Sequence, residues 1–523
     1  MKRFLRTASL ILVAAFAPLV ALWVRRSEMT HLVWVVPGAA VVALFLFGLW
    51  YAVFDRAPVR ARLRRCGFAL LAFAILGFAA SRLLRYEGSV SGSSFPKFAW
   101  AWEKATVPGT SPVVEALPSA SPPPEGAADL LDFLGPGRDG MGGPPPFGTD
   151  WTARPPEPLW RRPIGKGWSS FTVAGPFALT QQQIGDDEHV TCLDLATGRN
   201  LWNHAAPQTR LLLERAENGG AAMGGDGPRA TPTIHGGRVY AMGSTGVVNC
   251  LDLETGALVW SRHLLRDLGA ETQKWGMANS PLVLPEESLV VFAGPDRSGP
   301  TLVACDLASG ETRWIHEGGG ASYSSPRLLT LAGARQIVSV NFADVCGLDP
   351  ATGATLWRHP WPGTFPKVGQ PIALTGNRLL VTASYGAGSL LLKIARSEDG
   401  GFAVTPLWKS TQMKTKFSSA AVVGEHAYGL DEGRLACIDL ATGKRVWKKE
   451  KFGFGQHLLF GSWLLVQTEA GEVVLGEVGP AGFAEAARLP ALSSMTWNAP
   501  AVAGRVLLVR NDREAAAWLL PEP

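Results

Sequence analysis

A short motif built on an aspartate, a glycine and a tryptophan recurs five times in this chain of 523 residues. Its first copy reads Cys192-Leu-Asp-Leu-Ala-Thr-Gly-Arg-Asn-Leu-Trp202. Self-similarity at a period of roughly 40 to 60 residues is typical of solenoids and propellers. The three marker residues of the five copies are Asp194, Gly198 and Trp202; Asp252, Gly256 and Trp260; Asp306, Gly310 and Trp314; Asp349, Gly353 and Trp357; Asp439, Gly443 and Trp447.

Each copy has the pattern of a β-hairpin. An apolar, β-prone segment precedes the aspartate, and another follows the glycine and ends at the tryptophan. The aspartate can accept backbone N–H groups of the turn, the glycine supplies a positive φ, and the tryptophan packs the second strand. A catalytic or metal-binding residue has no reason to recur in every repeat. We therefore interpret the five aspartates as turn residues.

A second marker counts the repeats independently. A pair of small or polar residues opens an apolar strand, which a glycine turn and another strand follow. The pairs are Ser169-Ser170, Thr231-Pro232, Ser280-Pro281, Ser325-Pro326, Gln370-Pro371, Ser418-Ser419, Gln456-His457 and Ala499-Pro500. These pairs predict an all-β, eight-bladed propeller with four strands in each blade. The last unit lacks a fourth strand, and Pro158–Arg162 is expected to supply it and close the ring.

The chain before the repeats divides by composition. Three apolar segments, at about 8–24, 31–54 and 67–84, predict an α-helical membrane anchor over residues 1–85, although the first could also be a signal peptide. The arginines between the second and third segments predict a cytoplasmic loop, which places the propeller on the outer, periplasmic side of the inner membrane. Residues 86–150 are rich in Pro, Gly and Ser and are expected to form a linker. Residues 151–523 form the propeller.

Cysteine usage and charge exclude several classes. Three cysteines lie two residues before a motif aspartate, at equivalent places in different blades, so they should not pair and are expected to be small buried residues. No His/Cys cluster has the spacing of a metal site. The formal net charge of +5 is too modest to suggest nucleic acid as a partner.

Cations and aromatic residues recur just before the inner strands, on connections that crowd one end of a propeller. They form the only convergent polar set in the sequence and could attract an anionic ligand or an acidic partner, although solvated loop residues would look the same. Asp186-Asp187-Glu188 is interpreted as a solvated hairpin tip. The candidate binding residues are Lys166, Trp168, Arg229, Lys274, Trp275, Asn279, Tyr323, Lys367, Gln370, Lys416, Gln456, Trp497 and Asn498, with Lys414 and His457 beside them.

The recurring Cys/Ala-x-Asp-x-x-Thr-Gly-x-x-x-Trp pattern resembles the pyrroloquinoline quinone (PQQ) enzyme repeat, over residues 151–523. The resemblance implies one of two branches. One holds the quinoprotein alcohol and glucose dehydrogenases, and the other holds BamB-like propellers, which are scaffolds of outer-membrane protein assembly. The modest length of the propeller favours the second branch, and no residue here matches the family's calcium ligand or catalytic base.

The expected function is therefore that of a membrane-anchored, exported, non-catalytic binding or scaffold module. It would bind protein partners or an anionic ligand through the inter-blade loops, with no cofactor and no catalytic or metal-ligating residue. The alternative is a PQQ-dependent quinoprotein dehydrogenase of alcohols or sugars, which would hold PQQ with calcium. An acidic residue near the cationic end of the propeller would favour this alternative, because calcium binding and proton abstraction both need one.

Overall fold

A computed structural model describes residues 15–16, 18–22, 35–54, 58–89, 96–102, 119–207, 209, 225–295, 299–318, 320–363 and 365–523. The chain divides into two compact units. Unit 1 comprises residues 1–106 and 214–224, and unit 2 comprises residues 107–213 and 225–523. Each unit is described by itself.

The described part of unit 1 holds two helices and a hairpin. The helices are α2 (Val35–Phe54) and α3 (Val59–Leu83), and the hairpin pairs β1 (Leu84–Ser89) with β2 (Pro96–Trp100). No helix among the described residues is both long enough and apolar enough to cross a membrane. The predicted three-span anchor is therefore not confirmed, and most of its first span, 8–24, lies outside the described residues.

The described part of the segment between the second and third predicted spans is mostly helical, and its cytoplasmic location stays a prediction. Four of its arginines lie in the first half of α3, because arginine is a good helix former and Pro58 sets the extended backbone that precedes the helix. The predicted third span is thus only part of a longer helix that also carries arginines. These four residues are Arg60, Arg62, Arg64 and Arg65.

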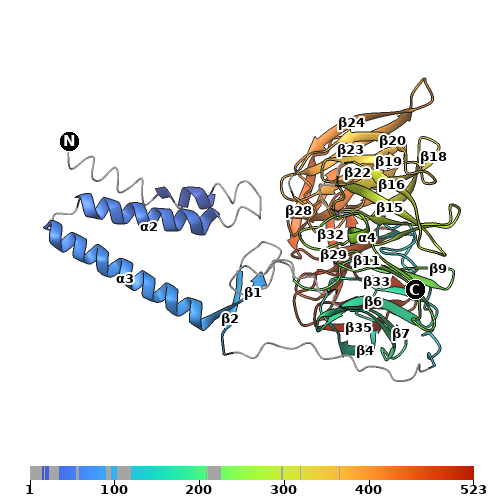
Figure 1. Ribbon diagram of the computed structural model, residues 1–523, viewed down its shortest axis with the longest axis horizontal. Coiled ribbons are helices and arrows are strands. Elements are labelled where there is room, and N and C mark those ends of the chain that lie inside the picture. Colours follow the sequence, from blue (N-terminus) through green and yellow to red (C-terminus); the bar gives the residue numbers. More distant parts are fainter. Residues whose placement is uncertain are drawn as a thin grey trace. The chain divides into compact units, whose positions relative to one another are not determined.

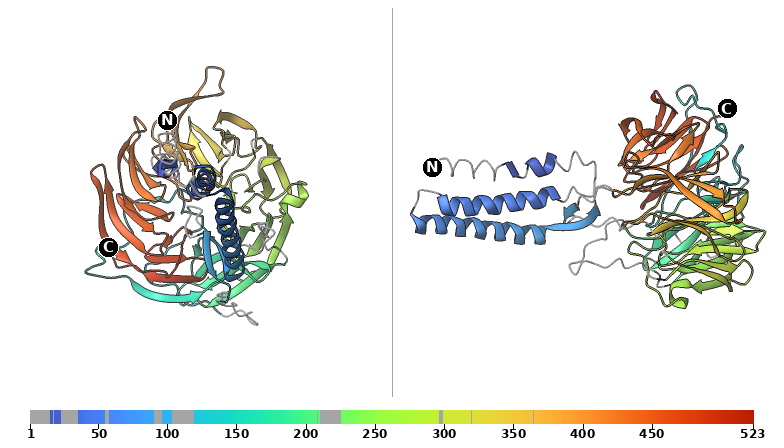
Figure 2. Two further views of the ribbon diagram at one scale, coloured as in Figure 1. Left: turned by 90° about the vertical axis from the view of Figure 1, so that its left-hand side faces the viewer. Right: turned by 90° about the horizontal axis from the view of Figure 1, so that it is seen from above.

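Unit 2 contains the propeller, and its eight sheets are arranged in a ring (Figure 2). Every blade contains four antiparallel strands, numbered here from the inner strand outward. These strands follow chain order in blades 1–7, whereas blade 8 takes its fourth strand from earlier in the chain, and a fifth strand, β3 (Met141–Gly142), joins blade 7 in parallel. Blade 1 is β5 (Thr172–Ala174), β6 (Phe177–Ile184), β7 (Asp187–Asp194) and β8 (Asn200–Ala206). Blade 2 is β9 (Thr233–His235), β10 (Arg238–Met242), β11 (Val247–Asp252) and β12 (Leu258–His263). Blade 3 is β13 (Leu282–Leu284), β14 (Leu289–Ala293), β15 (Pro300–Asp306) and β16 (Thr312–Glu317). Blade 4 is β17 (Arg327–Leu331), β18 (Ala334–Val340), β19 (Asp344–Leu348) and β20 (Thr355–Pro360).

The remaining blades follow the same plan (Figure 1). Blade 5 is β21 (Ile372–Leu374), β22 (Arg378–Ala383), β23 (Gly388–Arg396) and β24 (Phe402–Ser410). Blade 6 is β25 (Ala421–Val423), β26 (His426–Asp431), β27 (Arg434–Asp439) and β28 (Arg445–Lys451). Blade 7 is β29 (Gln456–Phe460), β30 (Trp463–Gln467), β31 (Val473–Gly479) and β32 (Gly482–Leu489). Blade 8 is β33 (Ala501–Ala503), β34 (Val506–Arg510), β35 (Glu514–Leu519) and β4 (Glu157–Pro163). A short helix, α4 (Leu264–Asp267), joins blades 2 and 3.

The ring closes as predicted. Strand β4, far earlier in the sequence than the rest of blade 8, pairs antiparallel with β35 and supplies the fourth strand, with Trp160 opposite Ala517. This pairing leaves no gap between the first and the last blade. The eight-bladed propeller with four-stranded blades is confirmed.

The predicted turns are also confirmed. In the first copy the Asp194 carboxylate accepts the N–H groups of Ala196 at 3.1 Å and Thr197 at 2.9 Å, and Gly198 has a φ of 69°. The five cysteines of the propeller that the structure describes are buried and form no disulfide, as expected from their equivalent places in separate blades.

In most blades the motif tryptophan has a partner in the next blade, which explains why the two halves of the motif recur together; Trp357 instead donates to Gln336 of its own blade. The Trp202 Nε1 donates to the carbonyl of Leu253 at 3.0 Å, and the indole ring lies against Gly256. Trp160, Trp260, Trp314 and Trp408 contact the following blade in the same way. The glycine is thus required twice, for the backbone conformation of its own turn and for the ring of the preceding blade.

Replacement of Gly256 by alanine is expected to cost about 2–4 kcal/mol of unfolding free energy. An added Cβ would lie 2.6 Å from the Trp202 ring, and the φ of 69° disfavours any L side chain. Gly236 is the matched control, since its φ is 56° and an added Cβ meets nothing within 4 Å, so Gly236→Ala should cost only about 1 kcal/mol. Urea unfolding of both variants measures the difference. Equal costs would show that the tryptophan contact contributes little.

The second half of the predicted linker belongs to the propeller. Residues 119–150, here called the strap, lie within unit 2 and run from blade 1 across inner strands and hairpin turns of other blades. Leu130 pairs with Val173 of β5, and the N–H of Ile234 in β9 donates to the carbonyl of Leu131 at 2.9 Å. A two-residue strand of the strap, β3 (Met141–Gly142), pairs in parallel with β29.

Two arginines fix the middle of the strap. The Arg138 side chain is 4% exposed and donates to the carbonyls of Ser280 and Pro281, both at 2.9 Å. In the opposite direction, Arg327 of β17 donates to the Asp139 carboxylate at 2.7 Å. Farther along, Phe147 and Trp151 are buried in the core of blades 7 and 8. A Pro- and Gly-rich composition predicted a linker, but backbone pairing and buried guanidinium groups order this segment.

Candidate binding site on the inter-blade connections

The predicted site residues lie on the connections between the outermost strand of one blade and the innermost strand of the next. Because strands within each blade are antiparallel, these connections all leave from the same end of the blades. That end is here called the loop face. The strap contacts the opposite end, at the turns between the first and second strands near Gly175 and Gly504. The described residues of the connections are 164–171, 207, 209, 225–232, 264–281, 318, 320–326, 361–363, 365–371, 411–420, 452–455 and 490–500.

A belt of side-chain oxygens joins the connections around much of the ring. The Thr231 hydroxyl accepts the backbone N–H of Ser170 at 3.0 Å, and the Ser280 hydroxyl accepts the N–H of Thr231 at 3.0 Å. Ser325 accepts from Ser280 at 2.9 Å, and farther along the ring Ser419 accepts from Gln370 at 2.9 Å. The small polar pairs that counted the blades in the sequence therefore connect neighbouring blades.

The predicted amide residues reinforce this belt. The Asn279 amide donates to the carbonyls of Ser322 and Ser324, and the Asn498 amide donates to that of Ser169 at 2.7 Å. Gln456 donates to the carbonyls of two other connections, those of Phe417 at 2.6 Å and Trp497 at 3.0 Å. These three amides hold neighbouring connections together and do not converge on one point. His457 is buried, and burial lowers the pKa of its imidazole to about 4.

The predicted cations face acids, carbonyls or rings of the protein itself. Lys166 forms an ion pair with Asp226 at 2.6 Å, and Lys414 forms one with Asp431 at 3.1 Å. Lys274 is exposed, and its ammonium lies 5.0 Å from the centre of the Trp275 ring. The sequence predicted an electropositive end of the propeller, whereas the structure surrounds most of these charges with groups that compensate them.

Two of the lysines are buried. The Lys367 ammonium donates to the carbonyls of Asn341 at 2.8 Å and Phe342, and burial lowers its pKa to about 8. The Lys416 ammonium lies 4.4 Å from the Phe454 ring and 4.9 Å from the Tyr385 ring. Burial likewise lowers the pKa of Lys416 to about 8, although Glu432 and Glu469 oppose the shift. Each ammonium is held by local contacts.

Glu188 is buried, so the prediction of a solvated tip is wrong for this residue. Its side chain is 3% exposed and accepts the backbone N–H of Ser244 at 2.8 Å and the Ser244 hydroxyl. Burial raises the pKa of the Glu188 carboxyl to about 7, against the opposing effects of Ser244 and Arg229. The turn at Gly185 sends the strand back so that Glu188 faces the neighbouring blade. Hydrophilic composition alone could not reveal this orientation.

The raised pKa predicts a pH dependence of stability that Glu188→Gln removes. A carboxyl whose folded pKa of about 7 exceeds its ordinary value of 4.5 stabilises the fold fully below pH 4.5, and that contribution is lost as pH rises through 7. We expect wild type to lose up to about 3 kcal/mol relative to the variant over this range, because His457, whose pKa burial lowers to about 4, titrates alike in both proteins. Unfolding midpoints between pH 4 and 8 measure both. Glu477→Gln is the matched control, because this exposed carboxylate also accepts a serine hydroxyl, that of Ser462 at 2.7 Å.

The predicted aromatic residues of the loop face fall into two groups of ring contacts, and a further pair, Phe365 and Tyr385, stacks at 5.0 Å between ring centres. Trp497 contacts Trp168 at 4.8 Å and Phe417 at 5.1 Å between ring centres. Trp275 contacts Tyr323 at 5.9 Å, and the Tyr323 hydroxyl accepts the N–H of Trp275 at 3.1 Å. The sequence predicted one stacking floor, and the structure brings these residues together in pairs on separate parts of the ring.

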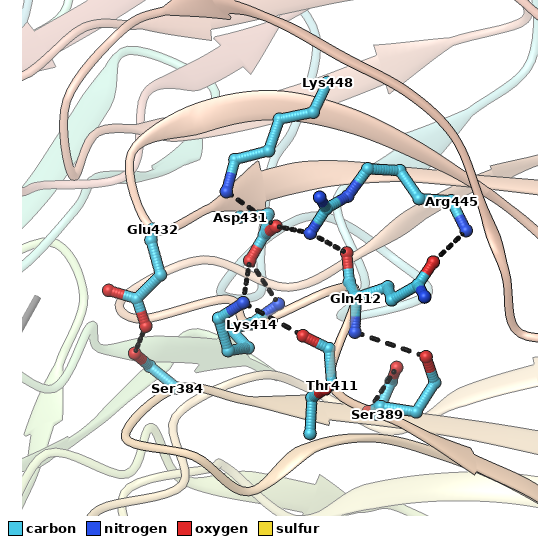
Figure 3. A network of polar contacts seen from close by, with 10 residues as sticks. Ser384, Ser389, Thr411, Gln412, Lys414, Asp431, Glu432, Arg445 and Lys448 are labelled. Carbon is cyan, nitrogen blue, oxygen red and sulfur yellow. Dashed lines mark hydrogen bonds and ion pairs between the residues drawn. The ribbon is translucent and has the colours of Figure 1, made fainter. Parts of the chain in front are cut away.

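A buried charge network on blade 6 was missed by the sequence analysis (Figure 3). The Asp431 carboxylate is fully buried and contacts three cations: Lys414 at 3.1 Å, Arg445 at 3.0 Å and Lys448 at 2.9 Å. The next residue, Glu432, accepts the Ser384 hydroxyl of blade 5 at 2.6 Å. Arg445 and Lys448 lie on β28, among alternating charges that suggest only a solvated outer strand. The spacing of Arg445 and Lys448 from Asp431 in the sequence does not predict their contact with it.

Acidic residues therefore lie close to the predicted cations. They do not gather into a metal site, because no group of three or more His, Cys, Asp or Glu residues in the described part of the chain is placed to hold a metal ion. The acids at this face accept hydrogen bonds from the protein or form ion pairs with its cations.

The chain matches the family model described as outer membrane protein assembly factor BamB over residues 186–449, about half its length. The chain belongs to this PQQ-repeat family. No curated protein matches it significantly. Among solved structures, the quinohemoprotein alcohol dehydrogenase of Comamonas testosteroni is 12% identical to this chain. The match spans 76% of this chain and 81% of the dehydrogenase chain, with a TM-score of 0.57.

Two further structures are similar. BamB from Moraxella catarrhalis is 14% identical over 70% of this chain and 98% of its own, with a TM-score of 0.49. Quinohemoprotein alcohol dehydrogenase ADHIIG from Pseudomonas putida HK5 is 12% identical over 70% of this chain and 76% of the dehydrogenase chain, with a TM-score of 0.50. At these identities the likeness concerns the fold alone, so the choice between a scaffold and a dehydrogenase depends on the site.

Proposed function

We propose that this protein is a non-catalytic binding module that engages protein partners through the loop face. The observation that carries the proposal is the surface composition of the connections and of the turn between β22 and β23, which holds Tyr385. Phe365 is exposed, Trp275 and Tyr385 are half-buried, and Lys274 is exposed beside Trp275. Aromatic side chains that keep part of their surface in water are the residues that most often anchor protein–protein interfaces.

The belt beneath the loop face supports the same proposal. Hydroxyls and amides hold the connections to one another, and the internal ion pairs compensate most of the cations. A surface held in this way is preorganised, and preorganisation lowers the entropic cost of binding a partner. An anionic ligand is a weaker candidate, because the lysines that would attract it already contact acids, carbonyls and rings.

Site-specific photo-crosslinking tests the proposal. A photoreactive amino acid would replace Lys274 or Phe365 on the loop face, and Leu258 or Leu407 on the outer strands as exposed controls. We expect the two loop-face positions to crosslink the same protein and the two controls to crosslink none. Trp275→Ala should weaken that crosslink severalfold. Equal crosslinking at the outer-strand positions would contradict a loop-face interface.

The alternative is a PQQ-dependent dehydrogenase of alcohols or sugars. The acids near the loop face are the observation in its favour, since the reaction would need a calcium ligand and a base. The residues present nevertheless do not fit the cofactor. Lys367 and Lys414 already bind partners within the protein, and Glu188 is buried against Ser244. These side chains would have to leave their partners before they could hold a quinone.

We also propose that the propeller works outside the cytoplasm, attached to the inner membrane. The apolar and arginine-rich sequence before residue 86 supports this location. Cell fractionation with an alkaline wash, followed by protease digestion of intact spheroplasts, tests it. We expect the chain to stay with the membrane fraction and the propeller to be digested from outside. Recovery in the cytosolic fraction would contradict the proposal.

A further inference from the structure

The inner strands of the propeller are sheet edges, and the strap pairs with several of them. An edge strand presents a row of N–H and C=O groups that can template another chain. In blade 1, Val173 and Leu130 exchange both backbone hydrogen bonds at 2.8 Å. In blade 2, the N–H of Ile234 donates to Leu131 at 2.9 Å. In blade 8, Ala128 donates to the carbonyl of Ala503 at 3.2 Å. The strap thus uses the hydrogen-bonding groups of three neighbouring edges.

A fourth edge is used after the strap has crossed to blade 7. The N–H of Leu459 in β29 donates to the carbonyl of Gly140 at 2.7 Å, and that of Gly461 donates to Gly142 at 3.2 Å. This parallel pairing makes β3 a fifth strand of blade 7. Backbone pairing of an extended segment with a sheet edge is the mode by which many domains bind peptides.

Side chains give this pairing its specificity. Arg138 inserts between the connections and inner strands, and its guanidinium donates to the carbonyls of Ser280 and Pro281 as well as to Asp132 of the strap. The next residue, Asp139, accepts from Arg327 of blade 4 at 2.7 Å, and both arginine side chains are buried. A buried arginine and a partly buried carboxylate in adjacent positions define a recognition element of opposite charges.

We propose that the inner edges of the propeller form a peptide-binding surface, and that the strap is its ligand within the same chain. The surface recognises an extended segment in which an arginine is followed by an aspartate. A protein segment of that chemistry would compete with the strap. This site meets the connections of the loop face at the carbonyls of Ser280 and Pro281, but it does not depend on the function proposed above.

Competition in the full-length chain tests the proposal. The strap variant Arg138→Ala/Asp139→Ala removes both side-chain anchors and leaves the propeller residues intact. The matched control is Gly143→Ala, since an added Cβ there meets nothing within 4 Å. Two quantities are measured: hydrogen exchange of the amides of Val173, Ile234 and Leu459, and binding of a fluorescent synthetic peptide of residues 124–148.

We expect exchange at the three amides to speed up about tenfold or more in the strap variant and to stay slow in wild type and in Gly143→Ala. The peptide should bind the strap variant saturably and wild type hardly at all. A peptide carrying the two alanines should bind about tenfold more weakly or worse, because two charge-assisted contacts are missing.

Two results would overturn the proposal. One is unchanged exchange at the three amides in the strap variant, which would mean that the charged pair does not hold the strap. The other is fast exchange without saturable peptide binding, which would mean that the inner edges do not recognise the segment. Should the double variant fail to fold, Asp139→Asn alone weakens one anchor, and the same two results decide.

Discussion

A chain that begins at Trp151 is expected to be less stable than one that begins at Ser119 by on the order of 5 kcal/mol or more. The shorter chain lacks the strap, and with it the backbone bonds to four inner edges and the guanidinium contacts of Arg138. It also leaves Arg327 buried without the carboxylate of Asp139. Calorimetric melting of the two chains measures the difference, which should be roughly 6 °C or more.

The matched control is full-length Gly143→Ala, which alters the strap where no atom is near. Its melting temperature should equal that of wild type. Melting of the chain that begins at Trp151 within a degree or two of the longer chain would show that the strap rests on a propeller that is complete without it.

The second large effect is expected at Asp431. Asp431→Asn would leave Lys414, Arg445 and Lys448 around a neutral group, and uncompensated buried charge typically costs about 3–5 kcal/mol. Asp267→Asn is the control, since its pair with Arg262 at 2.7 Å is partly exposed and should be worth about 1 kcal/mol or less. Chemical denaturation compares the two variants.

A second substitution separates charge from packing. Lys448→Met in the Asp431→Asn background removes one of the excess cations, so it should restore part of the lost stability. A cost for Asp431→Asn no larger than that for Asp267→Asn would contradict the view that the carboxylate holds this end of blade 6 together.

The architecture was largely predictable because the residues of each repeat determine the local structure of that repeat. Each motif residue has a role that suits one residue type: Asp194 accepts turn N–H groups, Gly198 adopts a positive φ, and Trp202 contacts the next blade. The same residue types therefore recur in most of the blades. Ring closure by β4 followed from counting strands, since Trp160 had no blade of its own. Local signals of this kind survive in a single sequence.

The strap was missed for the opposite reason. Its proline and glycine residues have the composition of a linker, and its order comes from contacts with blades more than a hundred residues away, such as that between Arg138 and Pro281. The three-helix anchor rested on composition as well, and the described helices do not confirm it. Long-range contacts of this kind leave no periodic trace.

The candidate site was predicted in position and only partly in character. The sequence placed Lys166, Lys367 and Trp275 correctly on the inter-blade connections, but it could not show that each already has a partner there. Glu188 is charged and lies next to a predicted turn, two features that are typical of a surface residue. Its burial depends on the fold of the neighbouring blade, where Ser244 lies.

Titration calorimetry of the full-length chain with PQQ and calcium tests most directly whether this propeller is a binding module or a dehydrogenase. We expect no saturable heat at micromolar concentrations, because the lysines and acids of the loop face contact other groups of the protein. Saturable binding that requires calcium and is lost in Lys416→Met would contradict it and would assign the loop face to a cofactor.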